Sequence, residues 1–323
     1  MIFIAYNDAQ GVRKCLESVR KQTYPQGQID IVFIDDGSTD DSIEVAKSFG
    51  ARVFVQPKGY IYKNWILGLH NIKGDFIFSL ETDIVLAGKD FLKKMVSPVL
   101  NDDRIIASFT EEKSSPDMHW AARFLTYNIA MCDPLLEFLL DTVESKIIER
   151  RKGYALCKFD EKLPPPVRMF YRVDYLRKTP NWNAENYFDH DFVINCVRSG
   201  YPYFAYVPDP GYFHYHVKSL KQLIQKRVRN VKMHFLPYYK KTEYTFLDTA
   251  KRNEVLKLLL FVVYANLFIP ATVRGFLRFL KHRDWVLLME PIITIGVVDS
   301  LLMTFLKDKN GRAYIFESIR SIM

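Results

Sequence analysis

The sequence contains few cysteines, and their spacing argues against a zinc site. Only four occur among 323 residues, and no two stand in a Cys-x-x-Cys spacing. Cys15 and Cys196 fall at apolar positions of expected helices, so we expect both to be reduced core residues, as suits the cytosol. The first four residues lack the basic stretch and the long apolar run of a signal peptide, so none is expected.

Negative charge is scarce in the C-terminal third only. From residue 215 onward there are 19 Lys or Arg and 8 Asp or Glu, a net charge of +11, whereas residues 1–214 carry 26 and 29. A basic tail on a near-neutral domain predicts an anionic partner, which could be a nucleic acid, a phosphorylated ligand or a lipid headgroup. The apolar character of this tail favours the membrane surface over nucleic acid.

The first hundred residues alternate between strand and helix patterns. Short apolar runs predict strands at residues 2–5, 29–34, 52–55 and 75–80. Helical spacing predicts helices near residues 12–19, 38–49, 63–72 and 91–100, and further on near 135–148 and 193–197. Ser38 and Gly50 are the expected start and end of the second helix. This alternation predicts an α/β fold with a mostly parallel sheet flanked by helices.

Acidic clusters follow two of the expected strands. Asp35-Asp36 comes after the second strand and Glu81-Thr82-Asp83 after the fourth. Ligands of such sheets bind beyond the carboxyl ends of the strands, so we expect both clusters to line one crevice. Each cluster also fits a simpler interpretation as a turn or a helix cap, because Asp-Gly-Ser is common in turns. No Gly-x-Gly-x-x-Gly follows the first strand, which disfavours a dinucleotide-dependent oxidoreductase.

An ordered set of motifs runs through residues 1–230. It consists of Tyr6-Asn7, Gln22-Thr23-Tyr24-Pro25, Asp35-Asp36-Gly37-Ser38, Lys63-Asn64, Gly74-Asp75 before Glu81-Thr82-Asp83, and Phe188-Asp189-His190-Asp191. With these motifs the chain resembles the family 2 glycosyltransferases, whose fold is of the GT-A type. The resemblance implies a mostly parallel GT-A sheet and transfer of a sugar from a nucleotide-diphosphate sugar.

The resemblance also implies where a UDP- or GDP-sugar donor would bind. Asp35 and Asp36 would accept hydrogen bonds from the base and the ribose. The other expected contacts to the donor are Tyr6, Asn7, Lys63, Asn64, Glu81, Arg227 and Arg229. Arginine suits a diphosphate, although residues 218–232 also fit a solvated basic helix near a membrane.

A divalent cation, Mn²⁺ or Mg²⁺, is implied at the second acidic cluster. Such an ion would neutralise the diphosphate leaving group. Asp83 matches the position that ligates the metal in similar proteins, while Glu81 departs from the usual Asp and could reach a ribose or a metal-bound water. His214 is the expected second ligand. His216 shares the face of His214, because the two alternate along an extended stretch.

Inverting transfer needs one carboxylate that takes the proton of the acceptor hydroxyl. By resemblance Asp189 is this catalytic base and Asp191 braces the site or the helix start, where negative charge is favourable. Both could instead be helix caps. Phe188 stands where similar proteins carry Glu, which affects the expected acceptor contacts.

Two apolar stretches mark the tail, and neither is a clear membrane span. Residues 258–273 are uncharged but number only 16, and residues 285–306 contain Glu290 and Asp299. If both crossed, they would form a hairpin whose loop at residues 274–284 carries four basic residues, against the positive-inside tendency. We therefore expect interfacial or partial insertion; a soluble helical pair is the alternative.

Together these observations predict an enzyme with two parts. Residues 1–230 would form the catalytic domain, with a nucleotide-binding half at 1–100 and an acceptor half at 101–230, and residues 231–323 a membrane-associated helical region. We expect a metal-dependent transferase at the cytoplasmic face of the cell membrane, acting on a lipid-linked or cell-envelope glycan. The Gln-x-x-Arg-Trp signature of processive synthases is missing, which favours non-processive transfer. A non-catalytic module that binds sugar nucleotides or membranes is the alternative.

Overall fold

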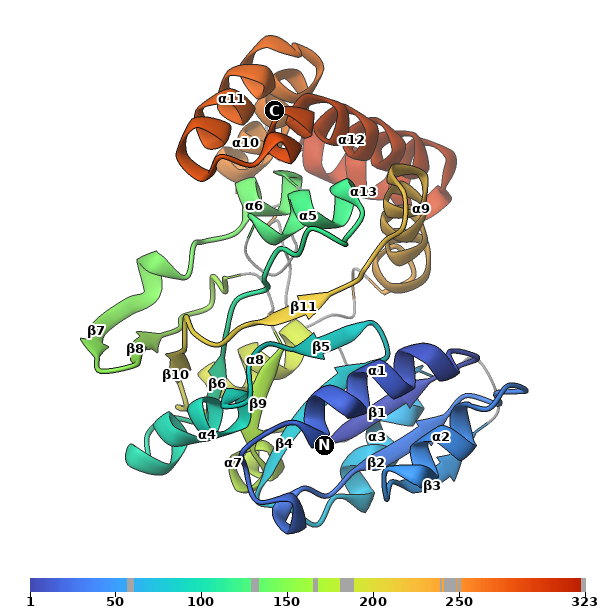
Figure 1. Ribbon diagram of the computed structural model, residues 1–323. Coiled ribbons are helices and arrows are strands. Elements are labelled where there is room, and N and C mark those ends of the chain that lie inside the picture. Colours follow the sequence, from blue (N-terminus) through green and yellow to red (C-terminus); the bar gives the residue numbers. More distant parts are fainter. Residues whose placement is uncertain are drawn as a thin grey trace. The chain divides into compact units, whose positions relative to one another are not determined.

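The computed structural model describes residues 1–56, 61–128, 134–164, 168–180, 189–238, 240, 248 and 251–320. The chain divides into two compact units. Unit 1 consists of Met1–Lys113 and Val143–His214, and unit 2 of Ser114–Thr142 and Tyr215–Met323 (Figure 1). This division differs from the boundary expected at residue 230. Helix α9 (Leu220–Asn230) belongs to unit 2 because Ile224 packs beside Gly296 of helix α12 (Glu290–Lys307).

Unit 1 is built on a nine-stranded sheet in the order β3-β2-β1-β4-β9-β6-β10-β8-β7. Its strands are β1 (Ile2–Ala5), β2 (Val32–Asp35), β3 (Arg52–Val55), β4 (Phe76–Glu81), β6 (Ala107–Phe109), β7 (Ile147–Arg151), β8 (Tyr154–Lys158), β9 (Met169–Arg172) and β10 (Tyr203–Tyr206). Only β9 and β8 run against the direction of β1, since each pairs antiparallel with its neighbours. The sheet is therefore mostly parallel in direction, as expected.

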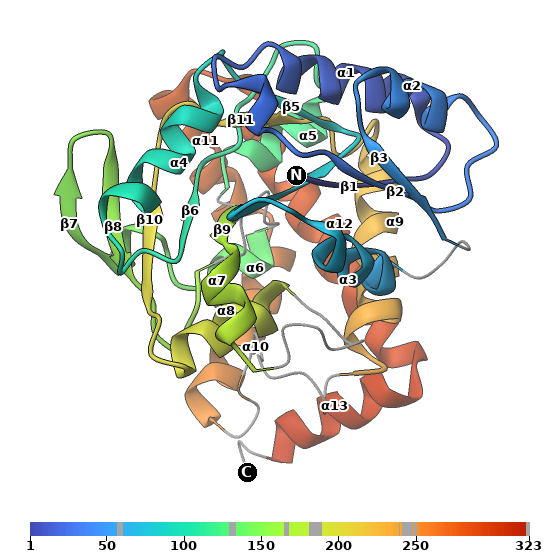
Figure 2. The same ribbon diagram turned by 90° about the horizontal axis from the view of Figure 1, so that it is seen from below.

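Helices cover both faces of this sheet. The helices of unit 1 are α1 (Ala9–Arg20), α2 (Ser42–Ser48), α3 (Ile61–Asn71), α4 (Phe91–Asn101), α7 (Val173–Lys178) and α8 (Asp189–Arg198), with short 3₁₀ turns at Gln26–Gln28 and Glu144–Lys146. Figure 2 shows α1, α2 and α4 on one face and α3, α7 and α8 on the other. A second, two-stranded sheet pairs β5 (Ile84–Leu86) with β11 (Tyr212–His214).

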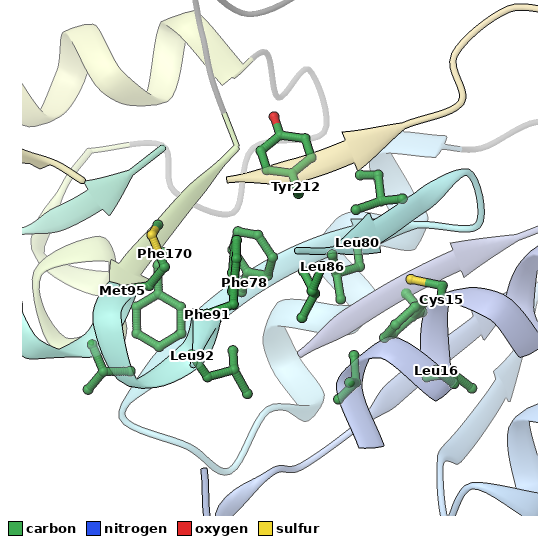
Figure 3. Packing of buried hydrophobic residues seen from close by; sticks show 14 of the residues in the cluster. Cys15, Leu16, Phe78, Leu80, Leu86, Phe91, Leu92, Met95, Phe170 and Tyr212 are labelled. Carbon is green, nitrogen blue, oxygen red and sulfur yellow. The ribbon is translucent and has the colours of Figure 1, made fainter. Parts of the chain in front are cut away.

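The main core lies between the sheet and the layer of α1 and α4. Alternation along β4 places Phe78 and Leu80 on this face, and the rings of Phe78 and Phe91 lie 5.5 Å apart (Figure 3). Cys15 is fully buried here and carries a free thiol, as expected, and burial raises its pKa. Because β4 runs through the middle of this packing, the residues that follow it are held by the core.

Two helix predictions were wrong. The second helix starts at Ser42 rather than at Ser38, because Ser38 Oγ accepts the N–H of Asn7 and its segment forms a turn. The helix expected at 135–148 ends much earlier, as α6 (Pro134–Leu139), and Ile147 already begins an edge strand.

Unit 2 is helical in the part of the chain that the structure describes. Its helices are α5 (Trp120–Thr126), α6, α9, α10 (Arg252–Asn266), α11 (Ile269–His282), α12 and α13 (Lys309–Arg320), with a π-helical turn at Val231–Phe235 and a 3₁₀ turn at Trp285–Met289. The carboxylate of Glu290, at the start of α12, is fully buried and is held by Arg274 and by Arg278 at 3.0 Å. This buried ion cluster ties α11 to α12.

The apolar tail does not form the hairpin of two straight segments considered from the sequence. The stretch 258–273 is broken at Leu267 and Phe268, where α10 and α11 bend by 82°. Residues 274–282, expected in a loop, belong to α11. Among the described helices, Trp285–Lys307 alone is long and apolar enough to cross a membrane, and half of its most apolar window is buried in protein.

Candidate active site

The acidic triplet forms the turn that joins β4 to β5. Thr82 and Asp83 follow directly after Glu81, the last residue of β4. Strand β11 pairs antiparallel with β5 and places His214 opposite Ile84. Asp83 Oδ1 consequently lies 3.4 Å from His214 Nε2. Two residues separated by 131 positions in the sequence are thus brought together.

Glu112 fixes the orientation of His214. Its Oε1 lies 3.1 Å from His214 Nδ1 and also accepts the hydroxyl of Tyr212 at 3.1 Å. Glu112 and His214 are both buried. With Nδ1 held by a carboxylate, the other ring nitrogen is directed toward Asp83, an arrangement that also raises the basicity of a metal-binding imidazole.

The two carboxylates control the charge of His214. Burial alone would lower its pKa, but the hydrogen bonds and charges of Asp83 and Glu112 outweigh burial and raise the pKa to about 9. In the absence of a cation the ring is therefore protonated at neutral pH. A bound cation has to replace that proton, since only the neutral imidazole can act as a ligand.

Glu81 is held by a partly buried arginine. Arg168, just before β9, donates to Glu81 Oε2 at 2.7 Å. Burial opposes the charge of Arg168, but Glu81 outweighs this and raises its pKa. Glu81 Oε2 lies 4.0 Å from His214 Nε2. The carboxylate of Glu81 thus pairs with the guanidinium of Arg168, whereas the carboxylate of Asp83 faces His214.

The start of α1 packs tightly beneath the same turn. A methyl group added at Gly11 would stand 2.8 Å from the carbonyl oxygen of Thr82 and 2.2 Å from Asp8 Oδ2. Asp8 caps α1 by accepting the N–H of Gly11 at 3.1 Å. Only glycine fits this position. The first turn of α1 therefore packs directly against the backbone of the turn that carries Glu81 and Asp83 and limits its movement.

The expected nucleoside contacts gather at the carboxyl end of β2. Asp35 is fully buried, and its Oδ2 accepts the N–H groups of Gly37 and Ser38 at 3.0 and 2.7 Å. Asn64 of α3, also fully buried, donates to Asp36 Oδ1 at 3.2 Å. Within the described ranges, Asp35 Oδ1 and Asn64 Oδ1 are buried acceptors without a hydrogen-bond partner. Buried acceptors of this kind suit a ligand that offers N–H or O–H groups.

The two residues after β1 differ in role. Asn7 has a positive φ of 46°, and its Oδ1 accepts the N–H of Thr39 at 2.7 Å, so it ties the loop after β1 to the loop after β2. Tyr6 is exposed beside it. Contact of either residue with a donor stays a prediction.

The remaining candidates are placed in part. Asp189 and Asp191 lie in the first turn of α8, which is anchored by an edge-on contact between Phe192 and Tyr171 at 4.9 Å. The side chains of Asp189 and Lys63, and Phe188 as a whole, lie outside the described residues. Arg227 and Arg229 lie on α9 in unit 2, to which His216 also belongs.

The ligand atoms of the site suit a divalent cation. Asp83 and His214 offer one carboxylate oxygen and one imidazole nitrogen that face each other, and Glu112 directs the imidazole from behind. Oxygen ligands suit Mg²⁺ and Mn²⁺, and imidazole is accepted by transition metals. The residues present therefore fit Mn²⁺ or Mg²⁺, with Mn²⁺ favoured by the nitrogen ligand.

Sequence reasoning missed Glu112 and Arg168. Neither stands in a motif of the first hundred residues, and each comes from a segment that reaches the site only through strand pairing. The one available signal was the acidic pair Glu111-Glu112, which comes shortly after the mostly apolar residues 105–109.

Comparisons with known proteins bear on this site. One curated relative is glycosyltransferase AglE of Haloferax volcanii, which is 39% identical over 49 residues; these are 15% of this chain and 16% of that protein. A second is glycosyltransferase GlyG of Streptococcus pneumoniae, which is 33% identical over 87 residues; these are 25% of this chain and 28% of that protein. These matches span less than a third of the relatives' length.

Two solved structures are similar at low identity. TarS of S. aureus in complex with UDP is 16% identical, with 99% of this chain and 88% of that chain covered and a TM-score of 0.47. Glucosyl-3-phosphoglycerate synthase of Mycobacterium tuberculosis with Mg²⁺ and UDP is 16% identical, with coverages of 69% and 72% and a TM-score of 0.43.

The family assignment rests on a longer match. Residues 1–178, more than half of the 323 residues, match glycosyl transferase family 2. That range contains β1 to β4, the two acidic clusters and the partners Glu112 and Arg168 described above. By this match the chain belongs to glycosyl transferase family 2.

Proposed function

We propose that this chain is an inverting glycosyltransferase that moves a sugar from a nucleoside-diphosphate sugar to an acceptor hydroxyl. The observation that carries the proposal is the pair of Asp83 and His214, whose ligand atoms lie 3.4 Å apart at the end of the central strand β4. Family membership supports the reaction class. Such a pair would hold a cation beside the diphosphate of the donor, as the donor chemistry requires.

Mn²⁺ or Mg²⁺ would be held by Asp83 Oδ1 and His214 Nε2. Bound there, the cation supplies neutralisation of the charge that develops on the departing diphosphate. Glu112 keeps His214 oriented, and Arg168 keeps Glu81 beside the ligands, where it can accept a ribose hydroxyl or a water. Each of these residues acts by position, because none of them needs to change its bonding during transfer.

The nucleoside would bind at the carboxyl end of β2. Asp35 Oδ1 and Asn64 Oδ1 are buried acceptors suited to the imide N–H of uracil or to a ribose hydroxyl. A guanine base also offers N–H donors, so both UDP- and GDP-sugars satisfy this chemistry. Lys63, Arg227 and Arg229 are the cations that we propose for the diphosphate.

Proton removal from the acceptor is assigned to Asp189. In a single in-line displacement the acceptor oxygen attacks the anomeric carbon as the nucleotide leaves, so the configuration inverts and one base suffices. Asp189 and Asp191 open α8, where the helix N-terminus favours their negative charge. Asp191 would brace this helix start rather than take the proton.

The acceptor and the location follow from unit 2. We propose that the enzyme works at the cytoplasmic face of the membrane on a lipid-linked or cell-envelope glycan and adds one sugar per encounter. Exposed apolar side chains on α10 and α11 support this location. A protein held at the membrane surface meets a lipid-linked acceptor at high local concentration.

A second candidate is a binding module that holds sugar nucleotides without turning them over. The ion pair between Glu81 and Arg168 is the observation that favours it, because this pair engages one acid of the expected catalytic triplet. Titration calorimetry with a panel of UDP- and GDP-sugars, with and without Mn²⁺, followed by an assay of nucleotide release, separates the two. The enzyme releases nucleotide diphosphate in the presence of Mn²⁺, whereas a binding module shows heat of binding and no release.

A further inference from the structure

Helix α10 presents an apolar face to the outside of unit 2. Leu256, Leu259, Leu260, Val263 and Leu267 are exposed and follow a helical spacing, so they form one stripe. On the opposite side Phe261 and Ala265 are buried against Val298 of α12. The helix therefore has an apolar interior contact and a second, outward apolar stripe, which a helix of a soluble domain normally lacks.

Helix α11 is apolar on the outside and polar on the inside. Ile269, Val273, Phe276, Leu277 and Leu280 are exposed at helical spacing, and Ile269 is 71% exposed. The inward face consists of Ala271 and Gly275 and of the two arginines that bind Glu290. A backbone contact fixes this orientation, because a methyl group added at Gly275 would stand 2.5 Å from the carbonyl oxygen of Leu287.

The two stripes meet at a sharp elbow. Phe268 has φ 59° and ψ −51°, and the N–H of Ile269 bonds the carbonyl of Leu267 at 2.6 Å, which forms a tight γ-turn. A bulky residue adopts this left-handed conformation rarely. The turn sets three exposed apolar side chains side by side, Leu267, Phe268 and Ile269, at the corner between α10 and α11.

Positive charge surrounds this apolar surface. Residues 251–283 contain seven Lys or Arg and one acid, Glu254; Arg274 and Arg278 are paired with Glu290 on the inward face, which leaves five basic residues outside that ion cluster. Arg252 precedes the first stripe, and Lys281 and Arg283 follow the second; all three are exposed. A second copy of the chain on the same face would bring like charges together, whereas an anionic lipid surface is complementary to them.

Neither helix is long enough to cross a bilayer. With 15 and 14 residues, α10 and α11 extend about 22 Å and about 21 Å at a rise of roughly 1.5 Å per residue. A hydrocarbon core of roughly 30 Å exceeds both, and the two helices are bent by 82° to each other, so they do not form one straight span. Such helices lie in the interface with their apolar face among the upper acyl chains.

We propose that the outward face of α10 and α11 docks into one leaflet of a membrane that contains anionic lipids, with the elbow at Leu267, Phe268 and Ile269 as its deepest point. This inference rests on the membrane location proposed above and adds the surface, the depth and the lipid charge. The partner is the lipid surface itself. The buried ion cluster at Glu290 keeps the two stripes turned outward.

Flotation of the full-length chain with vesicles tests the proposal. We expect binding to vesicles of phosphatidylcholine mixed with phosphatidylglycerol and weaker binding to phosphatidylcholine alone. Leu267→Gln combined with Ile269→Gln lowers the partition coefficient roughly tenfold or more on both vesicles, because apolar burial is lost. Ile148→Gln, on edge strand β7 and similarly exposed at 55%, is the matched control and binds as the unchanged protein does.

Charge and depth have separate readouts. Lys281→Gln combined with Arg283→Gln lowers binding roughly thirtyfold on the anionic vesicles only, since about 1 kcal/mol for each of the two basic residues is lost. Tryptophan placed by Ile269→Trp is quenched by brominated lipids relative to the same variant with unbrominated lipids, and tryptophan placed by Ile148→Trp is not.

Three results would overturn the proposal. The first is that the Leu267 and Ile269 double variant binds vesicles as well as the unchanged chain does. The second is that the unchanged chain binds no vesicles but forms a dimer that the double variant does not form. The third is that the bound protein resists extraction by alkaline carbonate, which marks a spanning segment. Donor hydrolysis is measured without vesicles in the same variants. Absence of donor hydrolysis would contradict the proposed catalysis, and absence of vesicle binding, measured without donor, would contradict the proposed docking surface. The two failures are therefore distinguishable.

Discussion

Glu112 determines which nitrogen of His214 is available to a ligand. Its carboxylate engages Nδ1 at 3.1 Å and is itself steadied by the hydroxyl of Tyr212. The imidazole is thereby left with Nε2 toward Asp83. Because the ring is buried and supported from behind, small changes at Glu112 should act on cation binding rather than on the fold.

Glu112→Gln is expected to weaken Mn²⁺ binding by about tenfold to a hundredfold, because an amide stabilises the metal-binding tautomer less than a carboxylate does. Affinity can be measured from free Mn²⁺ by electron paramagnetic resonance. Glu111→Gln, on the neighbouring exposed residue, is the control and should bind as the unchanged protein does. An unaltered affinity in Glu112→Gln would show that His214 is held by other groups.

His214 also predicts a pH dependence of cation binding. Its pKa is raised to about 9, so below that pH a proton must leave before the imidazole can act as a ligand. Mn²⁺ affinity should therefore rise with pH, by up to about tenfold per unit between neutrality and pH 9. Calorimetry in buffers of different ionisation enthalpy should record the release of about one proton.

The sign is opposite for the stability of the cation-free protein. A group whose folded pKa is raised stabilises the fold fully below its ordinary value of 6.5, and this contribution is lost as the pH rises through about 9. Chemical denaturation of the cation-free chain across this range checks the direction. His214→Ala serves as the control for both experiments, since it removes the titrating ring.

At the residue scale, the resemblance indicated Asp83 and His214 as candidate ligands, but not the residues that hold them in place. Asp83 matches a motif position of the resembling family, and His214 was expected from its place after the helix that carries Asp189. Glu112 and Arg168 could not be inferred, because the contact of each depends on how β6, β9 and β11 are ordered, and nothing in the local pattern specifies that order.

Among the elements, the start of α1 and the turn after β4 behave as one structure. Gly11 allows the first turn of α1 to lie against the carbonyl of Thr82 without any side chain between them. The turn therefore has little freedom to relax, and the distance between Asp83 and His214 depends on a helix that contributes no ligand.

Gly11→Ala is expected to destabilise the protein by roughly 1–3 kcal/mol, as over-packing does, and to weaken Mn²⁺ binding because Thr82 must move. Gly27→Ala is the matched control, since an added methyl group there meets nothing within 4 Å. Denaturant titration gives the stability and calorimetry gives the affinity. A Gly11→Ala protein with unchanged values for both would mean that the contact is not rigid.

Helix α8 is the element that carries the proposed base. Asp189→Asn should leave donor affinity within about twofold and abolish sugar transfer, because the amide cannot accept the acceptor's proton. Transfer to an acceptor, measured beside donor binding, checks this expectation. Asp174→Asn on α7, an exposed acid at the start of another helix, is the control. Normal turnover by Asp189→Asn would place the base elsewhere.

Strands and helices could be predicted from the sequence where burial of one face makes apolar residues recur at a regular spacing. The four strands of the first hundred residues appear within three residues of the expected positions; β1, β2 and β4 contain fully buried apolar side chains, whereas β3 is only partly buried. Ser38 misled because a hydroxyl that caps a helix can equally bridge two loops, as it does with Asn7. The uncharged stretch at 258–273 gave no hint of the γ-turn at Phe268, which hydropathy cannot detect.

For the whole molecule, the sequence predicted the α/β class and a helical tail, but not how the chain is partitioned. Residues 114–142 belong to unit 2, although in the sequence they come between strands β6 and β7 of unit 1. Glu290, one of the two acids that made residues 285–306 an unclear span, is buried beside Arg274 and Arg278, an ion cluster that the sequence pattern does not reveal. Tertiary pairing of this kind leaves no periodic signal.

Release of nucleotide diphosphate from a sugar-nucleotide donor, with and without Mn²⁺, compares the full-length chain directly with its Asp83→Ala variant. We predict Mn²⁺-dependent release by the unchanged chain and a loss of at least about a thousandfold in the variant, as follows from removing a principal source of charge stabilisation. Circular dichroism should show both proteins folded. Release by Asp83→Ala at the rate of the unchanged chain would contradict the assignment of the site.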